Sequence, residues 1–431
     1  MKIGLEIHVA LPTKTKLFCS DSTEEAHEPN VNVCPTCMGF PGSRPTLNKE
    51  AVRVAKSVSI ALNCDITNRI SFIRKVYFYP DLPKSFQITQ LSECIGKGGF
   101  IELEKKKIHL RRVQIEEDPA RIIRSEGHTL IDFNRSGIPL IEVVTEPDIT
   151  TEEELRETIF TLRTILYYQG IDINQEIKAD LNISLGTERV EVKNVTGIKN
   201  LISAAEYEIS RQSAILLNNG KIEVETRSFD EKSNTTKSSR KKESDEEYGF
   251  IFEPDLGFYS TEYMEMTPME MPTRAAFELA RSHNSSYKTI LELIAFDKDA
   301  LSILYKYEKK YDFKSLIATL EIAKRFNETK DANVFEELLK LVINGIAINQ
   351  ETVNKIKKGE KIEIKKFSKD EIDAAILEML KAEKDIVKRY SKNKNVINFI
   401  VGTVSRKYGI QPRDVIKRVE ILIDTLQKVE V

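Results

Sequence analysis

Long hydrophobic segments and an excess of one charge are both missing from this chain of 431 residues. No apolar run approaches the ~20 residues that cross a bilayer, which argues against a membrane-spanning helix. Lys and Arg total 65 and Asp and Glu total 67, so the net charge of −2 excludes a basic coat for nucleic acid over the whole surface. Glu6 places a charge too early for a signal peptide. We therefore expect a soluble, cytoplasmic protein that binds no membrane.

Familiar nucleotide-binding and amidase signatures are missing too. The chain has no Walker-type GxxxxGK[ST] motif and no convincing GxGxxG motif, so any ATP site must be of another type. No Ser-Lys amidase signature is evident, and no cysteine stands in an amidase-like setting. We expect the chain to release no ammonia from glutamine by itself.

Cysteine is scarce and confined to the first quarter of the chain, at Cys19, Cys34, Cys37, Cys64 and Cys94. A small secreted disulfide scaffold would spread an even number of cysteines over a short chain, so such a scaffold is a poor fit. Cys34 and Cys37 form a CxxC knuckle, and Cys19 with Asp21 is its natural upstream partner. Three thiolates and one carboxylate could hold a structural Zn²⁺ in tetrahedral geometry. The alternative is a knuckle held by packing and turn chemistry, without metal.

The pattern of the sequence changes near residue 258. Before it, alternating segments that predict strands, such as residues 4–9, are mixed with amphipathic helices, such as residues 48–63. After it, Gly and Pro thin out and apolar residues recur at helical spacing. We predict an α+β fold with an α/β domain over residues 1–258, a helical domain over 259–366 and a small helical tail over 367–431.

Three local patterns add detail. Thr150–Glu153 matches a capping box and predicts the start of a helix. Residues 228–247 are rich in Ser, Lys and Glu without apolar periodicity, which predicts a mobile loop or a charged hairpin. Residues 381–407 contain eight basic and two acidic residues, a local net charge of +6. This segment either contacts the phosphates of a nucleic acid or is an ordinary solvated lysine face.

Acidic residues gather in the predicted α/β domain. Glu6 and His8 are two apart on a predicted strand, so both side chains leave the same face and could hold a divalent cation. The acidic run Glu116–Asp118 follows an apolar strand, and Glu142 ends another. Together these oxygen ligands favour a Mg²⁺ site for phosphoryl chemistry. The alternatives are a buried histidine satisfied by a glutamate, and acids that are simply solvated.

Many motifs in one order make the sequence resemble the B subunit of the tRNA-dependent amidotransferases, the GatB family. The resemblance is specific over residues 1–230, and the helical half matches in layout. The motifs that carry it are Ile3-Gly-Leu-Glu-Ile-His8, Thr13-Lys-Thr-Lys-Leu-Phe-Cys19, Pro29-Asn-Val-Asn-Val-Cys-Pro-Thr-Cys37, Pro41-Gly42, Tyr77-Phe-Tyr-Pro-Asp-Leu-Pro83, Gln87-Ile-Thr-Gln90, Glu116-Glu-Asp118, Asp132-Phe-Asn-Arg135, Pro139-Leu-Ile-Glu142, Glu146-Pro-Asp148, Val192-Lys-Asn194, Glu225-Thr-Arg227 and Phe399-Ile-Val-Gly-Thr-Val404.

The resemblance implies a fold and a reaction. The N-terminal domain is expected to be a glutamine synthetase-like cradle that uses ATP and Mg²⁺ to amidate Glu-tRNA(Gln), Asp-tRNA(Asn) or both. The implied partners are an amidase subunit (GatA), which supplies ammonia from glutamine, a small subunit (GatC) and the misacylated tRNA, which the tail contacts. The alternative is a paralogue that binds tRNA but has lost catalysis.

The resemblance also implies roles for single residues. His8, Glu117 and Glu142 match the Mg²⁺ ligands, and Glu6 and Asp180 lie nearby; the residues expected to bind the nucleotide are Lys75, Arg135 and Lys193. The sequence departs from the family at 174–180, where Lys178 stands in place of an Arg, and at 248–255, where another Arg is missing.

Overall fold

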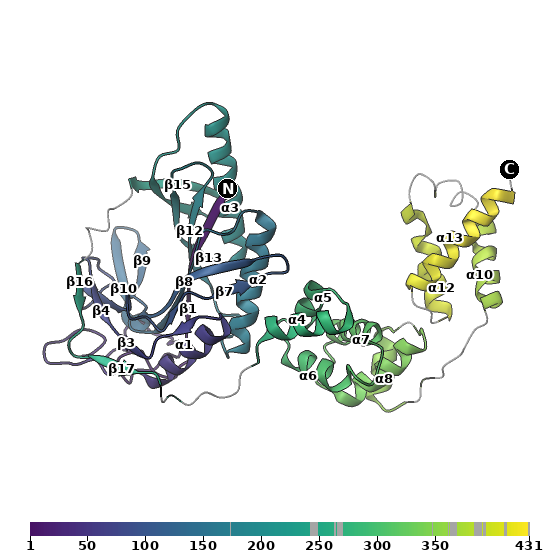
Figure 1. The fold of residues 1–431 in the computed structure, drawn as a ribbon, viewed down its shortest axis with the longest axis horizontal. Helices are drawn as coiled ribbons and strands as arrows, with labels where there is room; N and C mark the ends of the chain where they lie inside the picture. Colours follow the sequence, from purple (N-terminus) through teal and green to yellow (C-terminus); the bar gives the residue numbers. More distant parts are fainter. Residues whose placement is uncertain are drawn as a thin grey trace. The chain divides into compact units, whose positions relative to one another are not determined.

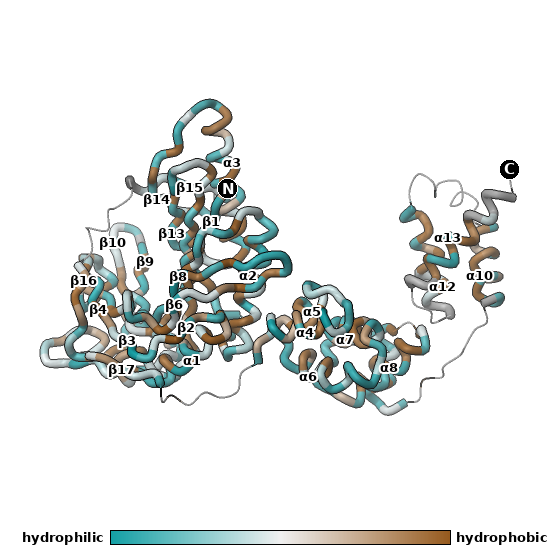
Figure 2. Tube along the Cα trace, in the orientation of Figure 1, coloured by the Kyte–Doolittle hydropathy of each residue, from teal (hydrophilic) through white to brown (hydrophobic). Residues whose placement is uncertain are grey.

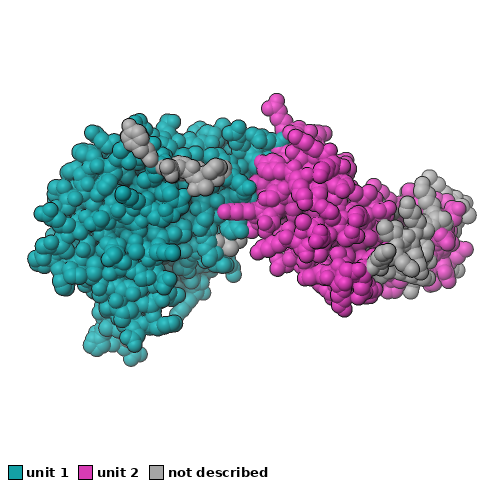
Figure 3. Space-filling view, turned by 90° about the horizontal axis from the view of Figure 1, so that it is seen from below, with its two compact units in different colours: residues 1–278 teal, residues 279–431 magenta. Residues whose placement is uncertain are grey.

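The computed structural model describes residues 1–172, 174–241, 249–262, 264, 270–346, 348–360, 362, 369–382, 390, 394–408 and 412–429. The chain divides into two compact units, residues 1–278 and 279–431 (Figure 3). Among the described residues, no helix is both long and apolar enough to cross a membrane. The predicted domain boundaries at residues 258 and 366 stay predictions.

The first unit mixes strands and helices (Figure 1). Its strands are β1 Lys2–Ala10, β2 Asp65–Ile66, β3 Arg69–Ser71, β4 Ile73–Val76, β5 Phe86–Thr89, β6 Gly96–Lys97, β7 Phe100–Glu102, β8 Lys107–Glu117, β9 Arg121–Ser125, β10 His128–Asp132, β11 Pro139–Thr145, β12 Lys178–Ser184, β13 Val190–Thr196, β14 Glu225–Asp230, β15 Thr235–Lys241, β16 Gly249–Phe252 and β17 Phe258–Ser260. Its helices are α1 Lys49–Ala61, the 3-10 turn η1 Phe133–Arg135, α2 Glu152–Tyr168 and α3 Ile198–Leu217. The next helix, α4 Pro272–His283, begins in this unit and ends in the second.

One large sheet organises this unit. Its strand order is β15-β14-β13-β12-β1-β11-β8-β6-β2, and β7 pairs with β8. Every pair is antiparallel except β13 and β14, which run parallel. The β9–β10 hairpin and the small sheet β16-β4-β5 are separate from it. The predicted α+β class is confirmed.

The central strand β1 shows why this sheet has one apolar and one polar face. Ile3, Leu5, Ile7 and Val9 are each at most 2% exposed and belong to the core that the sheet forms with α1, α2 and α3. Successive side chains of a strand point to opposite faces, so Glu6 and His8 leave the sheet on the other side. Figure 2 shows the same alternation of hydrophilic and hydrophobic residues along the strands near the middle of the unit.

Side-chain caps fix where the covering helices begin. The Asn48 carboxamide accepts hydrogen bonds from the first backbone N–H groups of α1, and the Thr151 hydroxyl accepts one from the N–H of Glu154 at the start of α2. The predicted capping box at Thr150–Glu153 is therefore wrong by one residue. Glu154 instead accepts hydrogen bonds from the backbone N–H and hydroxyl of Thr150, 2.7 and 2.9 Å away. Carboxylates in this first turn also interact favourably with the positive end of the helix dipole.

The polar segment after residue 224 forms a hairpin. β14 and β15 pair antiparallel over residues 225–230 and 235–241, which confirms the charged hairpin and not the mobile loop for this part. Residues 242–247 of that prediction, and Tyr248 of the departure from the family, lie outside the described residues.

The second unit consists of helices and turns where the structure describes it. Its helices are α5 Tyr287–Ile294, α6 Lys298–Tyr307, α7 Phe313–Phe326, α8 Ala332–Ile343, α9 Gln350–Lys357, α10 Lys369–Ala382, η3 Lys394–Ile397, α12 Asn398–Tyr408 and α13 Pro412–Val429. Buried residues between Ile372 and Ile423 form a core of their own. Lys384, Lys388, Arg389 and Lys392 of the predicted basic segment lie outside the described residues.

Candidate active site

Three side chains of metal-ligand type meet on the polar face of the sheet. The Nε2 atom of His8 lies 3.2 Å from an oxygen of Glu116 and 4.0 Å from an oxygen of Glu142. Strand register brings them together: His8 pairs with Glu142 across β1 and β11, and Glu142 pairs with Gln114 on β8, two residues before Glu116. The three ligand atoms all lie within 4.8 Å of one another. We call His8, Glu116 and Glu142 the histidine cluster.

Charge and burial perturb this cluster strongly. Burial lowers the pKa of His8, but Glu116, Glu142 and Asp180 outweigh it and raise the pKa to about 10. Burial, together with the charge of Glu116, raises the pKa of Glu142 to about 7. Burial also opposes ionisation of Glu116, yet the neighbouring His8 lowers the pKa of that carboxyl below its usual value. Perturbed groups of this kind, packed together on one face, are typical of functional sites.

Glu117, one of the three residues predicted to bind Mg²⁺, lies apart from the other two. Glu117 does not join His8 and Glu142, because consecutive residues of β8 point to opposite faces and Glu116 holds the cluster position. One carboxylate oxygen of Glu117 lies 2.6 Å from Lys84 Nζ, and the other accepts a hydrogen bond from the N–H of Ile88 on β5 at 2.8 Å.

The sequence contains a signal for which glutamate lies beside His8. Val113 and Ile115 on β8 are fully buried and apolar, and Glu117 shares their parity in the strand. Gln114 and Glu116 have the opposite parity, which is that of the polar face. Strict use of the alternation at this end of the strand would have selected Glu116.

A second group of carboxylates lies beside the first. Glu6 on β1, Asp180 on β12 and Glu191 on β13 have ligand oxygens within 4.8 Å of one another, and we call them the acidic cluster. Burial raises the pKa values of Asp180 and Glu191. The backbone N–H of Asn194 donates to Asp180 at 2.8 Å, and Asn182 Nδ2 donates to Glu6 at 3.2 Å. Glu191 was not among the residues predicted from the sequence, although its position between Val190 and Val192 in a strand was a signal.

Both clusters fit a hard divalent cation. Mg²⁺ prefers oxygen ligands and keeps several water molecules, so a site needs only a few protein donors. Each cluster offers carboxylate oxygens at convergent positions. Within the described residues, the buried Oδ1 atom of Asn182, whose amide nitrogen binds Glu6, has no hydrogen-bond partner and is a further oxygen donor beside the acidic cluster.

The basic residues expected to bind a nucleotide occupy three different settings. Lys75 lies on β4 and lowers the pKa of Glu116 through its charge, after the larger effects of burial and His8. Lys193 Nζ lies 4.0 Å from Glu191. Arg135 is bound to the chain itself: it lies 3.3 Å from Asp118 and donates hydrogen bonds to the carbonyl groups of residues 119 and 120. Lys75 and Lys193 thus border the two clusters, and Arg135 holds the end of β8.

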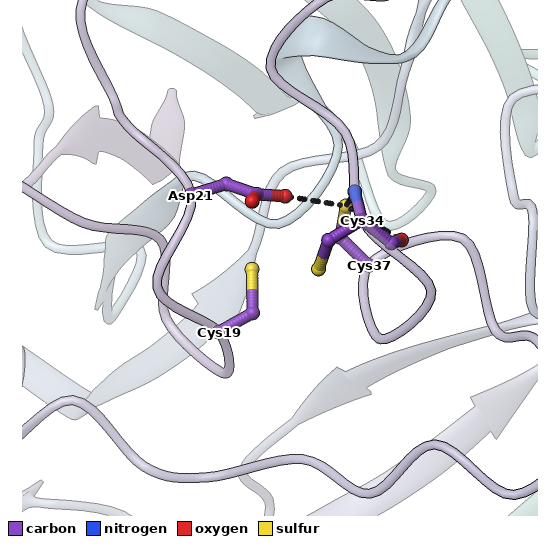
Figure 4. A group of neighbouring side chains, drawn as sticks. All are labelled: Cys19, Asp21, Cys34 and Cys37. Carbon is purple, nitrogen blue, oxygen red and sulfur yellow. Dashed lines mark hydrogen bonds between the residues drawn. The ribbon is translucent and has the colours of Figure 1, made fainter.

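The cysteine residues of the predicted knuckle converge with their carboxylate (Figure 4). The Sγ atoms of Cys19, Cys34 and Cys37 and an oxygen of Asp21 lie within 4.8 Å of one another, and we call these residues the cysteine cluster. A hydrogen bond with Cys19 lowers the pKa of Cys37 to about 6 and raises the pKa of Cys19. One thiol with a lowered pKa and a convergent S₃O donor set fit a tetrahedral Zn²⁺.

A fully buried lysine supports the cysteine cluster. Lys16 is 0% exposed, and its ammonium donates to the backbone carbonyl of Asn32 at 2.7 Å and lies 3.7 Å from Cys37 Sγ. A buried charge needs such partners because desolvation is costly. A cavity of about 130 Å³ adjoins this region; Lys16, Cys37, Lys84 and Glu117 are among its lining residues, but no member of the histidine cluster is.

Comparisons with known proteins place the chain in a family. The GatB/GatE catalytic domain matches residues 1–265. The chain belongs to the GatB/GatE family. It is 38% identical to the B subunit of the aspartyl/glutamyl-tRNA(Asn/Gln) amidotransferase of Sulfolobus acidocaldarius, over 94% of this chain and 96% of that protein. The B subunit of the same amidotransferase in Coprothermobacter proteolyticus is 36% identical over 94% of both chains. That of Methanoregula boonei is 44% identical over 59% of this chain and 56% of that protein.

The family match covers the residues of all three clusters. The matched residues 1–265 include every residue of the histidine, acidic and cysteine clusters. The resemblance seen in the sequence is therefore confirmed, and it extends through the helical unit in the relatives that align over 94% of the chain.

Proposed function

We propose that this chain is the subunit of a glutamine-dependent tRNA amidotransferase that activates and amidates the side-chain carboxylate of Glu-tRNA(Gln), Asp-tRNA(Asn) or both. An oxygen of that carboxylate attacks the γ-phosphorus of ATP, the bond to the bridging oxygen breaks, and ADP leaves. Ammonia then attacks the acyl carbon, phosphate leaves with the C–O bonding electrons, and the nitrogen loses a proton. The enzyme is accordingly a carbon-nitrogen ligase.

The observation that carries this proposal is the polar face of the sheet, where the histidine and acidic clusters are neighbours. Strand β1 links them, because it carries His8 of the first cluster and Glu6 of the second. A glutamine synthetase-like cradle would present such a face to its substrates. Mg²⁺, when bound by these residues, neutralises charge on the phosphates and orients them for in-line transfer. The chain's own contribution is to hold the ligand atoms in register: Gln114 Nε2 donates to Glu142, and the Thr89 hydroxyl donates to Glu116 at 3.3 Å. Lys75 and Lys193 border this face and are proposed to contact the nucleotide.

The cysteine cluster has a structural role in this proposal. Its four donors would complete a tetrahedral Zn²⁺ and leave no open position for a reacting water molecule. Bound zinc would tie the loop at residues 19–21 to the turn at residues 34–37. That turn is already closed by a hydrogen bond from the Met38 N–H to the Cys34 carbonyl at 3.0 Å.

The reaction requires partners. Ammonia is proposed to come from an amidase subunit (GatA), assisted by a small subunit (GatC), because this chain carries no amidase signature. The misacylated tRNA is the second partner, and the helical tail, residues 367–431, is proposed to contact its backbone. Aminoacyl-tRNA is used in translation, so the proposed site of action is the cytoplasm.

A transamidation assay tests the proposal. The purified complex receives Glu-tRNA(Gln) or Asp-tRNA(Asn), ATP, Mg²⁺ and either glutamine or ammonium, and the amide product is measured. We expect ATP-dependent product from at least one tRNA with either nitrogen source. A complex that binds both tRNAs but converts neither would instead favour the non-catalytic paralogue, an alternative that the convergence of both clusters argues against.

A further inference from the structure

Most basic side chains around the two clusters are already engaged by the protein. Lys84 pairs with Glu117 at 2.6 Å and Arg135 with Asp118 at 3.3 Å. Arg112 donates to Gln114 at 2.7 Å. A charge held in such a pair is partly neutralised and less available to an incoming anion.

Lys178 is different. Within the part of the chain that the structure describes, its ammonium makes no hydrogen bond and no ion pair, although the side chain is partly buried. A cation that no described side chain pairs with keeps its charge available to an anion that arrives from outside.

The register of β12 places Lys178 in the same cross-strand row as His8 and Glu142. Its Cα pairs with that of His8 on β1 and with that of Thr196 on β13. Directly paired residues of antiparallel strands share a face, so the side chains of Lys178 and His8 leave the sheet on the same side. Asp180, two residues further along β12, belongs to the acidic cluster. Lys178 therefore adjoins both clusters.

The charge of Lys178 reaches across this face. Burial raises the pKa of Asp118 to about 6, and the charges of Arg135 and Lys178 oppose that rise. Lys178 lies on β12 and Asp118 directly follows β8, and the strands β1 and β11 lie between β12 and β8 in the sheet. The charge of Lys178 is thus felt across β1 and β11, the strands that carry His8 and Glu142.

We propose that Lys178 binds the anionic end of the aminoacyl side chain, first as a carboxylate and then as an acyl phosphate. This inference rests on the proposed function. The face around Lys178 is lined with carboxylates, which repel an anionic substrate, and a cation opposite the histidine cluster offsets that repulsion. The ammonium offers three donors and no acceptor, so it can remain bound while the carboxylate oxygen forms its bond to phosphorus and while phosphate later leaves. It transfers no proton in either step.

Variants of Lys178 in the complete complex test this role. Lys178→Met keeps the length of the chain and removes the charge, Lys178→Arg keeps the charge, and Lys221→Met removes a charge from an exposed lysine far along the sequence. The measurements are kcat/KM for aminoacyl-tRNA with ammonium as nitrogen source and the Kd for ATP with Mg²⁺. Thermal unfolding verifies that each variant is folded, and Lys178→Gln replaces Lys178→Met if the latter is not.

We expect Lys178→Met to lower kcat/KM at least about 30-fold, because an anion bound away from water loses its charge partner. The Kd for ATP should change less than twofold, Lys178→Arg should recover to within about fivefold of wild type, and Lys221→Met should match wild type. Activity of Lys178→Met within threefold of wild type would overturn the role. So would an equal loss in ATP affinity, which would assign Lys178 to the nucleotide. A wild-type complex that amidates neither tRNA would overturn the proposed function itself, and this inference with it.

Discussion

The two faces of the central sheet share their strands but differ in almost everything else. On β1, Ile3, Leu5, Ile7 and Val9 are buried against the helices, and the residues between them, Glu6 and His8, belong to the two clusters. The first face is apolar, so its contribution to stability is proportional to the buried area and does not depend on the exact direction of each side chain. The second face is charged and convergent, so its contribution depends on which atoms meet.

Side chains that contribute to the core and side chains of the proposed site are therefore separated by one residue along the same strand. A substitution on the apolar face should lower the free energy of unfolding and leave turnover per folded molecule unchanged. A substitution on the polar face should lower turnover and leave the free energy of unfolding nearly unchanged.

Replacing His8 on the polar face should nearly abolish activity. We expect His8→Ala to lower ATP-dependent amidation at least about 100-fold, because loss of a metal ligand removes several kcal/mol of transition-state stabilisation. The matched control is His109→Ala, since His109 is 62% exposed and pairs with Asp148 at the surface. Steady-state turnover decides. An equal loss in both variants would show that any histidine replacement harms the enzyme.

Replacing Ile7 on the apolar face should lower stability. Ile7 is 1% exposed, and Ile7→Ala should cost about 3 kcal/mol of unfolding free energy through lost burial and the cavity left behind. Urea unfolding followed by circular dichroism measures this. Turnover per folded molecule should stay within about twofold of wild type. A variant that unfolds normally but loses turnover would contradict the separation of the two faces.

Removing zinc from the cysteine cluster should lower the thermal stability of the first unit without stopping turnover. We expect purified protein to contain about one zinc per chain, Cys37→Ser to lose it, and Cys64→Ser, outside the cluster, to keep it. Bound metal stabilises by about 2.7 kcal/mol when free zinc exceeds its Kd 100-fold. Elemental analysis and thermal unfolding measure both effects. Zinc retained by Cys37→Ser would refute the assignment, as would immediate loss of turnover when a chelator is added to an otherwise stable protein.

The smallest effect concerns the cap of α2, a helix of the apolar side. The Thr151 hydroxyl accepts a hydrogen bond from the Glu154 N–H at 3.1 Å, so Thr151→Ala should lower the unfolding free energy by about 1 kcal/mol. Thr150→Ala should cost less, because its hydroxyl bonds only a side chain at an exposed position. A larger loss for Thr150→Ala, again from urea unfolding, would return the cap to the residue that the sequence pattern suggested.

Much of this structure could be predicted from the sequence because local patterns determine it. The alternation in residues 4–9 and the helical face of residues 48–63 are properties of neighbouring residues, and both elements formed as β1 and α1. The convergence of the cysteine residues with Asp21 followed from spacing and a known knuckle. Motif order also sufficed to identify the family, which the comparisons confirm.

Glu117 was predicted from its match to the family's motif, and a motif match does not give the face of the sheet on which a side chain lies. That face depends on the side-chain alternation of β8, which changes inside the strand. Leu110 and Val113 are both buried although they are three residues apart, and the register with β11 shifts at the same point. Alternation counted from the beginning of β8 therefore gives the wrong face at its end.

Two further features were not predicted correctly from the sequence: the place of Glu191 in the acidic cluster and the cap of α2. Glu191 was missed because its partners Glu6 and Asp180 come from other strands, and Glu6 is distant in the sequence. The cap at Thr151 was displaced because Thr150 and Thr151 both precede a glutamate by three residues. Neither the pairing of strands nor the choice between equivalent caps is contained in a local pattern.

We infer that Glu116, and not its neighbour Glu117, would bind Mg²⁺ together with His8 and Glu142. Titration with Mn²⁺, followed by electron paramagnetic resonance, measures metal binding directly in Glu116→Gln and Glu117→Gln, with Mg²⁺ as competitor. We predict that Glu116→Gln weakens Mg²⁺-competable Mn²⁺ binding at least tenfold, because it loses a ligand, whereas Glu117→Gln loses only the partner of Lys84. Glu117→Gln should then bind within threefold of wild type. Strong binding by Glu116→Gln together with weak binding by Glu117→Gln would contradict the account.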